Sequence, residues 1–313
     1  FVIGRYCVND ARFVRRVLNK FRLAWLLDRF TWKLELLQLC RMFSNGGELL
    51  IQHPCMCRYL HMEAVVKDLR RLKRHKVRIT LLVHDVSQLR RLNDGSENSE
   101  GRIFDLADKV IVHNENMLRW FNETDPLGHY VVPLEIFDYL LDEKCHVVEH
   151  KPGREIVIAG GLSPVLGSFM ADLWKISGVK WKLYGPKAAP DQTWAGEVHH
   201  CGSFPPDELP SVLSGSWGLV WSGSSIDTCT GPSGEYLRYI NSHKLSLYIV
   251  SHLPVIVWKE SAVAAFVREY EVGVCVGSLH EIPEVIAKIS NEQYERFISK
   301  IISDTTVFVD YRN

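Results

Sequence analysis

No apolar run in this 313-residue sequence reaches the roughly 18–20 residues that a membrane-spanning helix needs. The sequence also has no internal repeat and no low-complexity segment, which excludes disordered, collagenous and coiled-coil proteins. The opening FVIGRYC lacks a basic leader and a long apolar region, so we expect a short strand there rather than a signal peptide. Hydrophobic residues make up 46% of the chain, enough for one large core or two medium ones.

Cysteine occurs without regular spacing, and no Cys-x-x-Cys pair is found. The eight cysteines are Cys7, Cys40, Cys55, Cys57, Cys145, Cys201, Cys229 and Cys275. The set His53-x-Cys55-x-Cys57-x3-His61 is the nearest approach to a zinc motif, but it has no second ligand pair elsewhere. We therefore expect reduced cysteines that are buried as apolar residues, no metal, no cofactor and a cytoplasmic location.

Lysine plus arginine and aspartate plus glutamate number 37 each, but the two signs are unevenly placed. Residues 1–93 hold 19 basic and 7 acidic side chains, and the remainder holds 18 basic and 30 acidic ones. Much of the positive charge lies in Arg12–Lys33 and Lys67–Arg91. A solvated helix face is the commoner meaning of such segments. The alternative is an anionic partner, either the inner face of a membrane or a lipid-pyrophosphate acceptor. Nucleic acid is not expected, because no helix-turn-helix, zinc-finger or RNP-like motif is present.

Apolar runs of strand length alternate with stretches of helical period, which predicts an α/β protein with parallel sheets. The expected strands are Val2–Tyr6, Glu48–Gln52, Val77–Val83, Lys109–Val112, Tyr130–Val132, Glu155–Ala159, Lys180–Tyr184, His199–Cys201, Trp217–Trp221, Pro254–Trp258 and Val272–Val276. The expected helices between them include Met62–His75, Ser168–Ile176, Pro206–Leu213, Ser233–Tyr239, His243–Val250 and Ser261–Glu269. The polar segment His146–Pro152 reads as a linker. It predicts two Rossmann-like domains, 1–149 and 150–313, with the ligand bound between them. The sequence does not decide whether the C-terminal helix packs on the first domain.

Residues 217–248 carry the strongest functional signal. A buried strand is followed by a loop that contains Ser222 and Asp227, and then by a helix start with Asn241, His243 and Lys244. Backbone N–H groups at a helix N-terminus attract anions, and an adjacent lysine adds a full positive charge. After a parallel strand, this pattern predicts a site for a nucleotide diphosphate. An ordinary capped helix with a solvated lysine is the alternative.

Other candidate binding residues follow neighbouring strands. Gly160 and Gly161 would let the backbone approach a phosphate closely, although a tight turn is the alternative. Tyr184 and Gly185 end the next strand, where the ring could flank a nucleobase or simply stand at a chain turn. Phe204 opens another loop on the same edge. Glu235 could bind sugar or ribose hydroxyls, unless it only complements the helix dipole.

Candidate catalytic residues end a strand of the first half. His84 and Asp85 follow the run ITLLV, at the edge of a parallel sheet where ligands bind. Asp85 could take the proton from an acceptor hydroxyl, and His84 could do the same or donate to a phosphate. Helix capping by Asp85 and packing of His84 are the alternatives. Gln52 ends the preceding strand with His53, and both would lie beside His84.

From residue 45 onward, the motifs resemble those of bacterial GT-B glycosyltransferases that use nucleotide sugars. The resemblance is to the group of β-1,6-galactofuranosyltransferases and the glucosyltransferase that extends serine-rich adhesin glycans. The residues that carry it are Gln52-His53-Pro54, Val83-His84-Asp85-Val86, Ala107–Asn114, Leu134–Tyr139, Ala159–Leu162, Leu183–Gly185, Gly218–Trp221, Ser225–Cys229, Gly234–Tyr239, Asn241–Tyr248 and Leu253–Trp258. The pieces Ser-Ile-Asp-x-Cys and Gly-Glu-Tyr-Leu-x-Tyr favour the galactofuranosyl branch.

The resemblance implies a metal-independent and inverting transfer of a hexose from a UDP-sugar to a glycan acceptor, with self-association of the chain. Lys244 would neutralise the diphosphate, Asn241 and His243 would line its pocket, and Lys244 would join His84 and Asp85 as a catalytic residue. The segment Cys7–Asp10 lacks the glycine that relatives carry in a loop over the donor, which leaves the general base open. A UDP-sugar epimerase of the same fold and a non-catalytic subunit that binds nucleotide sugar or membrane are the alternative functions.

Overall fold

The structure is a computed structural model that describes the chain in two units. The residues described are 2–3, 33, 41–43, 45–54, 62–90, 97–124, 128, 130–141, 145–163, 167–189 and 191–305. Unit 1 comprises Phe1–Val112 and Met117–Pro133, and unit 2 comprises His113–Asn116 and Leu134–Asn313. The domain boundary predicted from the sequence lies at 149. Residues 134–149 cluster with unit 2, where the buried Ile136 belongs to the same hydrophobic cluster as Val157 and Ala159. The expectations for Cys7–Asp10, for most of Arg12–Lys33 and for Cys55, Cys57 and His61 fall outside the described residues.

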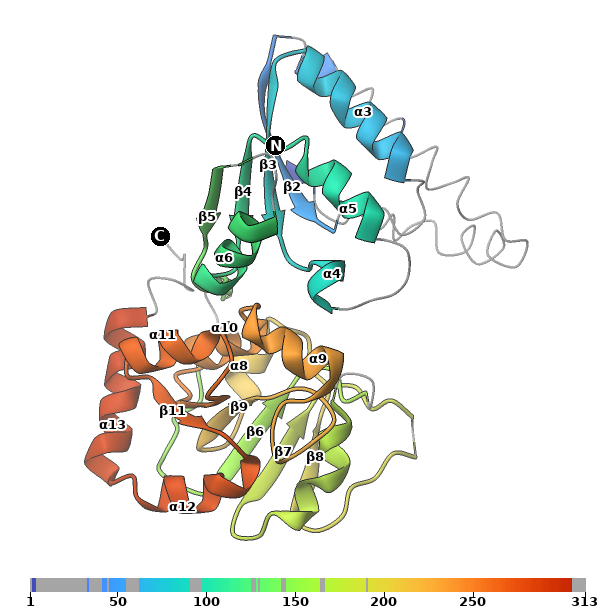
Figure 1. Ribbon diagram of the computed structural model, residues 1–313. Coiled ribbons are helices and arrows are strands. Elements are labelled where there is room, and N and C mark those ends of the chain that lie inside the picture. The colour runs from blue at the N-terminus through green and yellow to red at the C-terminus, as the bar shows by residue number, and fades with distance from the viewer. Residues whose placement is uncertain are drawn as a thin grey trace. The chain divides into compact units, whose positions relative to one another are not determined.

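Unit 1 is built on a parallel sheet of strand order β1-β2-β3-β4-β5 (Figure 1). Its elements are β1 (Val2–Ile3), β2 (Gly47–His53), α3 (Met62–Arg74), β3 (Val77–Val83), α4 (Ser87–Arg90), α5 (Glu97–Phe104), β4 (Lys109–Val112), α6 (Glu115–Thr124) and β5 (Tyr130–Pro133). Alternate residues of β3 are buried, which is the pattern of a strand with one covered face. Helix α3 contacts β3 and α5 and buries Val66, Leu69 and Leu72 at helical spacing.

Unit 2 is built on a six-stranded parallel sheet of order β11-β10-β9-β6-β7-β8. Its strands are β6 (Glu155–Ala159), β7 (Lys180–Tyr184), β8 (Val198–Gly202), β9 (Trp217–Val220), β10 (Val255–Trp258) and β11 (Gly273–Val276). Its helical segments are η2 (Ser168–Lys175), α8 (Leu209–Val212), α9 (Gly231–Glu235), η3 (Tyr236–Arg238), α10 (His243–Val250), α11 (Val263–Glu269), η4 (Leu279–Glu281), α12 (Ile282–Ala287), α13 (Asn291–Lys300) and η5 (Ile301–Thr305).

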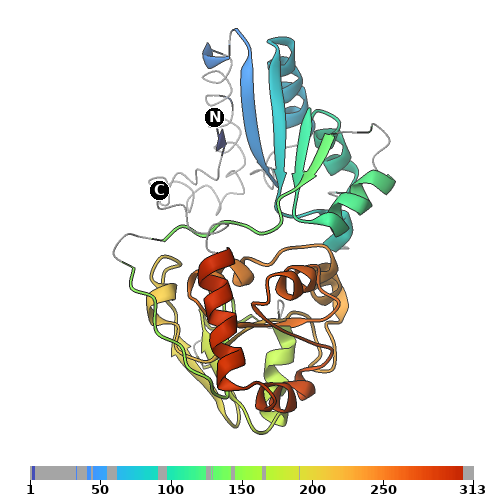
Figure 2. The ribbon, with the colours of Figure 1, turned by 90° about the vertical axis from the view of Figure 1, so that its left-hand side faces the viewer.

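Helices cover both faces of this second sheet (Figures 1 and 2). Side chains of η2, α12 and α13 share one hydrophobic cluster with Ile156 and Ile158. Side chains of α10 and α11 share the other cluster with Val157 and Ala159, the residues that point to the opposite face of the same strand. Because both faces are covered, the inner strands β6, β9 and β10 are nearly continuous apolar runs, which is why their positions were predicted closely from the sequence.

The order of the strands creates a switch point in unit 2. From β6 the chain proceeds outward through β7 and β8, and it then returns to β9 on the other side of β6. The connections after β6 and β9 therefore leave the sheet on opposite sides, and open α/β sheets bind ligands at the carboxyl ends of such a pair of strands. Among the residues that the structure describes, no helix is both long and apolar enough to cross a membrane.

Candidate anion site at the switch point of unit 2

Tyr248 of α10 fixes that helix to the switch point. Its hydroxyl accepts a hydrogen bond from the Ala159 N–H at 2.9 Å and lies 3.3 Å from the carbonyl oxygens of Val157 and Leu219. Strands β6 and β9 pair only at their first residues, so the hydroxyl supplies a bridge where the two strands diverge. Burial raises the pKa of Tyr248 above its usual range. Gly218 makes room for the ring, because a Cβ atom there would lie 2.4 Å from Tyr248 Cγ.

The backbone turns sharply where β6 and β7 end. Gly160 donates its N–H to the Tyr184 carbonyl at 2.9 Å, and Gly185 donates to the Gly202 carbonyl at 2.8 Å. Gly185 has φ +152°, and a Cβ atom there would lie 1.8 Å from the Gly160 carbonyl oxygen. Only glycine fits this approach. Gly160 and Gly185 therefore shape the strand edge together, whereas Gly161 is exposed.

Lys244, in the first turn of α10, extends to the end of β6. A Cβ atom at Gly160 would lie 3.4 Å from Lys244 Cε, so the lysine stem passes directly over this glycine. The side chain is half-buried, and burial of the amino group lowers its pKa to about 8, against a small opposing effect of Cys229. Within the described part of the chain, no carboxylate or carbonyl oxygen bonds the amino group. A desolvated ammonium group without a counter-charge attracts an anion strongly.

The helix start itself offers fewer free N–H groups than its sequence suggests. Ser242 is the N-cap, and its hydroxyl accepts from the Lys244 N–H at 3.3 Å. The Leu245 N–H donates to the Ser242 carbonyl at 2.9 Å. Two of the first three N–H groups of α10 are thus already bonded. An anion at this turn would interact chiefly with the Lys244 ammonium group and with the helix dipole.

The loop after β9 reaches the same region. Ser222 lies two residues after the end of this strand. The buried Cys229 is hydrogen-bonded to the Ser222 backbone and lies close enough to Lys244 for the two side chains to interact electrostatically. Burial raises the pKa of the Cys229 thiol to about 12, so this group is neutral at pH 7. Asp227 lies farther out: its carboxylate accepts from the Ser225 hydroxyl at 3.1 Å and lies 3.5 Å from His280. The switch point therefore brings together Gly160, Ser222 and Lys244.

Asn241 has a different environment from the one expected of a residue that lines a diphosphate pocket. It is buried, and its amide group donates to the carbonyls of His113 and Glu135 and accepts from Asn114 at 2.7 Å. Both amide hydrogens are used inside unit 2 and Oδ1 already accepts one bond, so contact of the Asn241 side chain with a ligand stays a prediction. His243 is exposed and packs against the Phe137 ring at a centroid distance of 4.4 Å.

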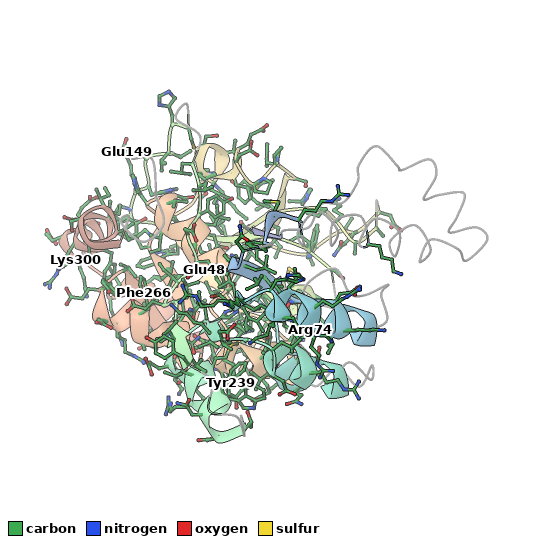
Figure 3. The ribbon with its side chains drawn as sticks, turned by 90° about the horizontal axis from the view of Figure 1, so that it is seen from above. Glu48, Arg74, Glu149, Tyr239, Phe266 and Lys300 are labelled. Atoms are coloured by element: carbon green, nitrogen blue, oxygen red, sulfur yellow. The ribbon has the colours of Figure 1, made fainter. Side chains whose placement is uncertain are left out.

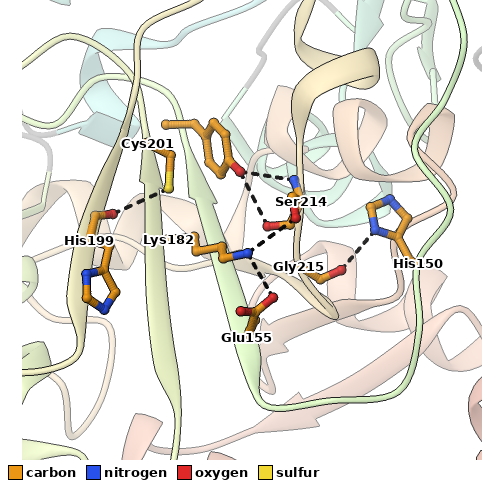
Figure 4. Close-up of polar contacts among 8 residues, drawn as sticks. His150, Glu155, Lys182, His199, Cys201, Ser214 and Gly215 are labelled. Atoms are coloured by element: carbon orange, nitrogen blue, oxygen red, sulfur yellow. Dashed lines mark hydrogen bonds and ion pairs between the residues drawn. The ribbon is translucent and has the colours of Figure 1, made fainter.

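The expectation that Tyr184 flanks a nucleobase is corrected by its burial. Its ring lies in the core of unit 2, and its hydroxyl accepts from the Ser214 N–H at 3.0 Å (Figure 4). Burial raises the pKa of Tyr184 to about 12. The side chains of a strand alternate between the two faces of the sheet up to its last residue, and Tyr184 points to the face covered by α10 and α11. Phe204 is half-buried, with its ring centroid 6.3 Å from that of Tyr184.

Glu235 is held in an ion pair rather than left open for a sugar. Its carboxylate accepts from Arg238 Nε at 2.9 Å, and Arg238 also pairs with Glu260 and lies over the Trp258 ring. A ribose or sugar hydroxyl could still reach the second carboxylate oxygen, because the Glu235 side chain is partly exposed.

The catalytic candidates of unit 1 lie at the ends of adjacent strands. The expectation that the β2 end lies beside His84 is confirmed, since the His84 N–H donates to the His53 carbonyl at 2.7 Å and Gln52 pairs in register with Leu82. Asp85 accepts from Arg90 Nη1 at 3.0 Å. Over the described ranges, no cluster of three or more His, Cys, Asp or Glu side chains is placed to hold a metal ion.

Three residues that shape this region were not among the candidates predicted from the sequence: Tyr248, Cys229 and His113. In the sequence, Tyr248 is not distinguishable from the other apolar residues of a buried helix. The one available signal was Gly218, since a glycine inside a buried strand often marks the close approach of a large group. His113 accepts a hydrogen bond from the Asn241 N–H at its ring nitrogen Nδ1, a contact between residues 128 positions apart that no local pattern indicates.

Comparison with known proteins gives consistent matches over both units. The family model "Glucosyltransferase 3-like, N-terminal domain" matches residues 10–134, and "Glucosyltransferase 3-like, C-terminal domain" matches residues 156–305. The chain is 32% identical over 236 residues to the β-1,6-galactofuranosyltransferase WbbI of Escherichia coli K12, covering 73% of this chain and 67% of the relative. It is 24% identical over 238 residues to Glucosyltransferase 3 of Streptococcus gordonii, covering 64% of this chain and 70% of the relative.

Solved structures of low sequence identity share the fold. Sucrose-phosphate synthase of Thermosynechococcus elongatus has a TM-score of 0.55 at 12% identity, over 82% of this chain and 69% of that protein. The Anabaena protein HepE in complex with UDP has a TM-score of 0.54 at 12% identity, over 88% and 78%. These neighbours are GT-B glycosyltransferases, and the predicted fold class of two parallel-sheet α/β domains is confirmed.

Proposed function

Because this chain belongs to the Glucosyltransferase 3-like family of bacterial GT-B glycosyltransferases, we propose that it transfers a hexose from a UDP-sugar to a hydroxyl group of a glycan acceptor. Galactofuranose is the favoured sugar and glucose the next, in the order of identity to the galactofuranosyl and glucosyl relatives. The proposed transfer needs no metal and inverts the configuration of the anomeric carbon.

The half-buried ammonium group of Lys244 is the single observation that carries the proposal for the donor. It lies against Gly160 at the switch point, has a pKa of about 8, and bonds no acidic side chain within the described residues. At pH 7 about nine in ten of such groups are charged. A diphosphate would provide the counter-charge, and the complexes of HepE with UDP are those of a protein with the same fold.

The chemistry follows from where negative charge develops. An acceptor hydroxyl oxygen attacks the anomeric carbon, and the bond from this carbon to the diphosphate oxygen breaks. UDP gains a negative charge as it leaves, and the Lys244 ammonium group with the positive end of the α10 dipole stabilises that charge. In a half-buried site this interaction is stronger than in bulk water. A single displacement of this kind inverts the anomeric configuration.

The proton of the acceptor hydroxyl requires a base, for which Asp85 is the proposed residue and His84 the alternative. The Asp85 carboxylate is held by Arg90 Nη1 at 3.0 Å. A proton transfer to Asp85 would use a carboxylate oxygen that this contact leaves accessible. Gln52, at the end of the neighbouring strand, would orient the acceptor.

The basic face of α3 supports a further part of the proposal, peripheral contact with a membrane or with a lipid-pyrophosphate acceptor. Lys67, Arg70, Arg71 and Arg74 are exposed at spacings of three and four residues, which places them on one helix face. Figure 3 shows Arg74 at the end of this helix. Each such residue near an anionic surface contributes about 1 kcal/mol of attraction. A cytoplasmic location and self-association remain predictions of the sequence.

A donor panel tests the proposed activity. UDP-galactofuranose, UDP-glucose and the corresponding GDP- and dTDP-sugars would be incubated with candidate glycan acceptors, and release of the nucleotide diphosphate would be measured. We expect UDP release that depends on acceptor, is fastest with UDP-galactofuranose, and falls at least about tenfold in Lys244→Met but not in Lys180→Met. Conversion of the sugar without acceptor would instead indicate an epimerase, and UDP binding without turnover would indicate a non-catalytic subunit.

A further inference from the structure

The chain passes between the two units at three places, and residues at all three are bonded to one short segment of unit 2. The passages follow Val112, Asn116 and Pro133. The segment is Arg238–Asn241, which directly precedes the N-cap of α10. The connections between the units and the helix turn that carries Lys244 therefore belong to one bonded cluster within unit 2.

The first passage is joined to this segment through backbone and side-chain groups of Asn241. The Asn241 N–H donates to Nδ1 of the buried His113 at 2.9 Å. The Asn241 side chain donates to the His113 carbonyl, and the Asn114 side chain donates both to Asn241 Oδ1 at 2.7 Å and to the Tyr239 carbonyl at 3.0 Å. Hydrogen bonds between such buried groups are costly to break, because water does not replace them readily.

The second and third passages join the same cluster. Asn116 donates its side-chain N–H to the Arg238 carbonyl at 2.8 Å. After the third passage, the Glu135 N–H donates to the His113 carbonyl at 3.0 Å, and the Glu135 carbonyl accepts from Asn241. Phe137 then packs between the rings of His113 and His243, at centroid distances of 4.8 and 4.4 Å. His243 is the first residue of α10, so the contact extends to the helix itself.

We propose that His113 and Asn241 are positioning residues that couple the binding of the donor diphosphate at Lys244 to the order of the segments connecting the two units. Asn241 lies three residues before Lys244, so a displacement of this segment displaces the ammonium group. A ligand that holds the turn in place then stabilises the ordered state of His113–Asn116 and Leu134–Phe137. By linkage, the factor by which the ligand favours this ordered state equals the factor by which the ordered state increases ligand affinity. The inference rests on the proposed function, since the ligand considered is UDP.

Hydrogen exchange of the full chain with and without saturating UDP tests this coupling. In the wild type, we expect UDP to slow amide exchange by about threefold or more in peptides that cover 113–116 and 134–137, as well as in the first turn of α10. In His113→Phe, which keeps a ring against Phe137 but removes the acceptor of the Asn241 N–H, the slowing at the connecting segments should disappear. UDP affinity should fall about fivefold to tenfold.

Conservative and control variants separate positioning from general damage. An asparagine at this position places a carbonyl oxygen near the position of the histidine Nδ1, where it can accept the Asn241 N–H. His113→Asn should therefore keep UDP affinity within about twofold of the wild type. Asn114→Ala provides a second test if His113→Phe does not fold, and Asn291→Ala, at an exposed site of unit 2, is the matched control.

Two outcomes contradict the account in different ways. If the wild type binds UDP but His113→Phe and Asn114→Ala behave like Asn291→Ala in both exchange and affinity, the coupling is wrong while the proposed function stands. If the folded wild type binds no UDP, the proposed function fails and the coupling fails with it.

Discussion

Replacing Tyr248 by phenylalanine should destabilise unit 2 by about 1–3 kcal/mol. The substitution removes one oxygen atom and leaves the packing of the ring unchanged. The Ala159 N–H, bonded to that oxygen at 2.9 Å, would become a buried donor without an acceptor. The carbonyl oxygens of Val157 and Leu219 would lose a donor at 3.3 Å. An unsatisfied buried polar group costs about 1–3 kcal/mol, and no water replaces the hydroxyl in a fully buried position.

Urea unfolding followed by tryptophan fluorescence would measure this loss. Four fully buried tryptophans, Trp181, Trp217, Trp221 and Trp258, lie in unit 2, so the signal reports chiefly on that unit. Tyr130→Phe is the control, because the Tyr130 side chain is exposed, and its free energy of unfolding should stay within about 0.5 kcal/mol of the wild type. If Tyr248→Phe changed stability no more than this control, the hydroxyl bridge between β6 and β9 would be refuted.

Further predictions concern two titrating groups and one glycine. UDP affinity should fall as the pH rises from about 7 through about 8, because the Lys244 ammonium group then loses its charge. In Lys244→Met the calorimetric affinity should not vary over the same interval. Burial lowers the pKa of His150. One ring nitrogen lies 2.9 Å from the Gly215 carbonyl (Figure 4), and the other lies 2.8 Å from the Ser251 carbonyl. Below about pH 6.5 the unfolded chain therefore binds a proton that the folded chain does not. The free energy of unfolding should therefore decrease as the pH falls through this range, and His150→Gln should remove that part of the pH dependence. Gly185→Ala should lower stability by about 2 kcal/mol or more in thermal unfolding, since its Cβ would collide with the Gly160 carbonyl, whereas Gly101→Ala, with no atom within 4 Å, should not.

The strands of both units could be predicted closely because burial leaves a direct mark on the sequence. Glu155–Ala159 and Lys180–Tyr184 have the predicted bounds. The first is largely an apolar run, and the second begins with lysines that alternate with apolar residues, which is also typical of a strand. The helix His243–Val250 also has the predicted bounds, and Ser242 is its N-cap. The predicted helix Ser168–Ile176 is a 3₁₀ helix over Ser168–Lys175, a helix type that the prediction did not specify. Apolar residues three positions apart suit both helix types, so the pattern does not distinguish them.

The candidate site was predictable only in part, for a physical reason. Lys244 and Gly160 lie at the ends of elements, where chain order and topology determine their neighbourhood. The direction of the Tyr184 ring and the hydrogen bonds of Asn241 depend on contacts with residues far away in the sequence. A polar residue that is bonded internally and one that faces a ligand have the same local pattern. The three-dimensional contacts were needed to separate them.

Calorimetric titration of the wild type with UDP, against GDP and dTDP, tests the central claim most directly when it is repeated on Lys244→Met and Lys180→Met. The account predicts micromolar and UDP-selective binding by the wild type and by Lys180→Met. In Lys244→Met, loss of a charge-assisted contact should weaken binding by about 1.5–3 kcal/mol, or roughly 10- to 150-fold. Absence of UDP binding by the folded wild type, or equal affinities of the two lysine variants, would contradict the assignment of a diphosphate site at Lys244.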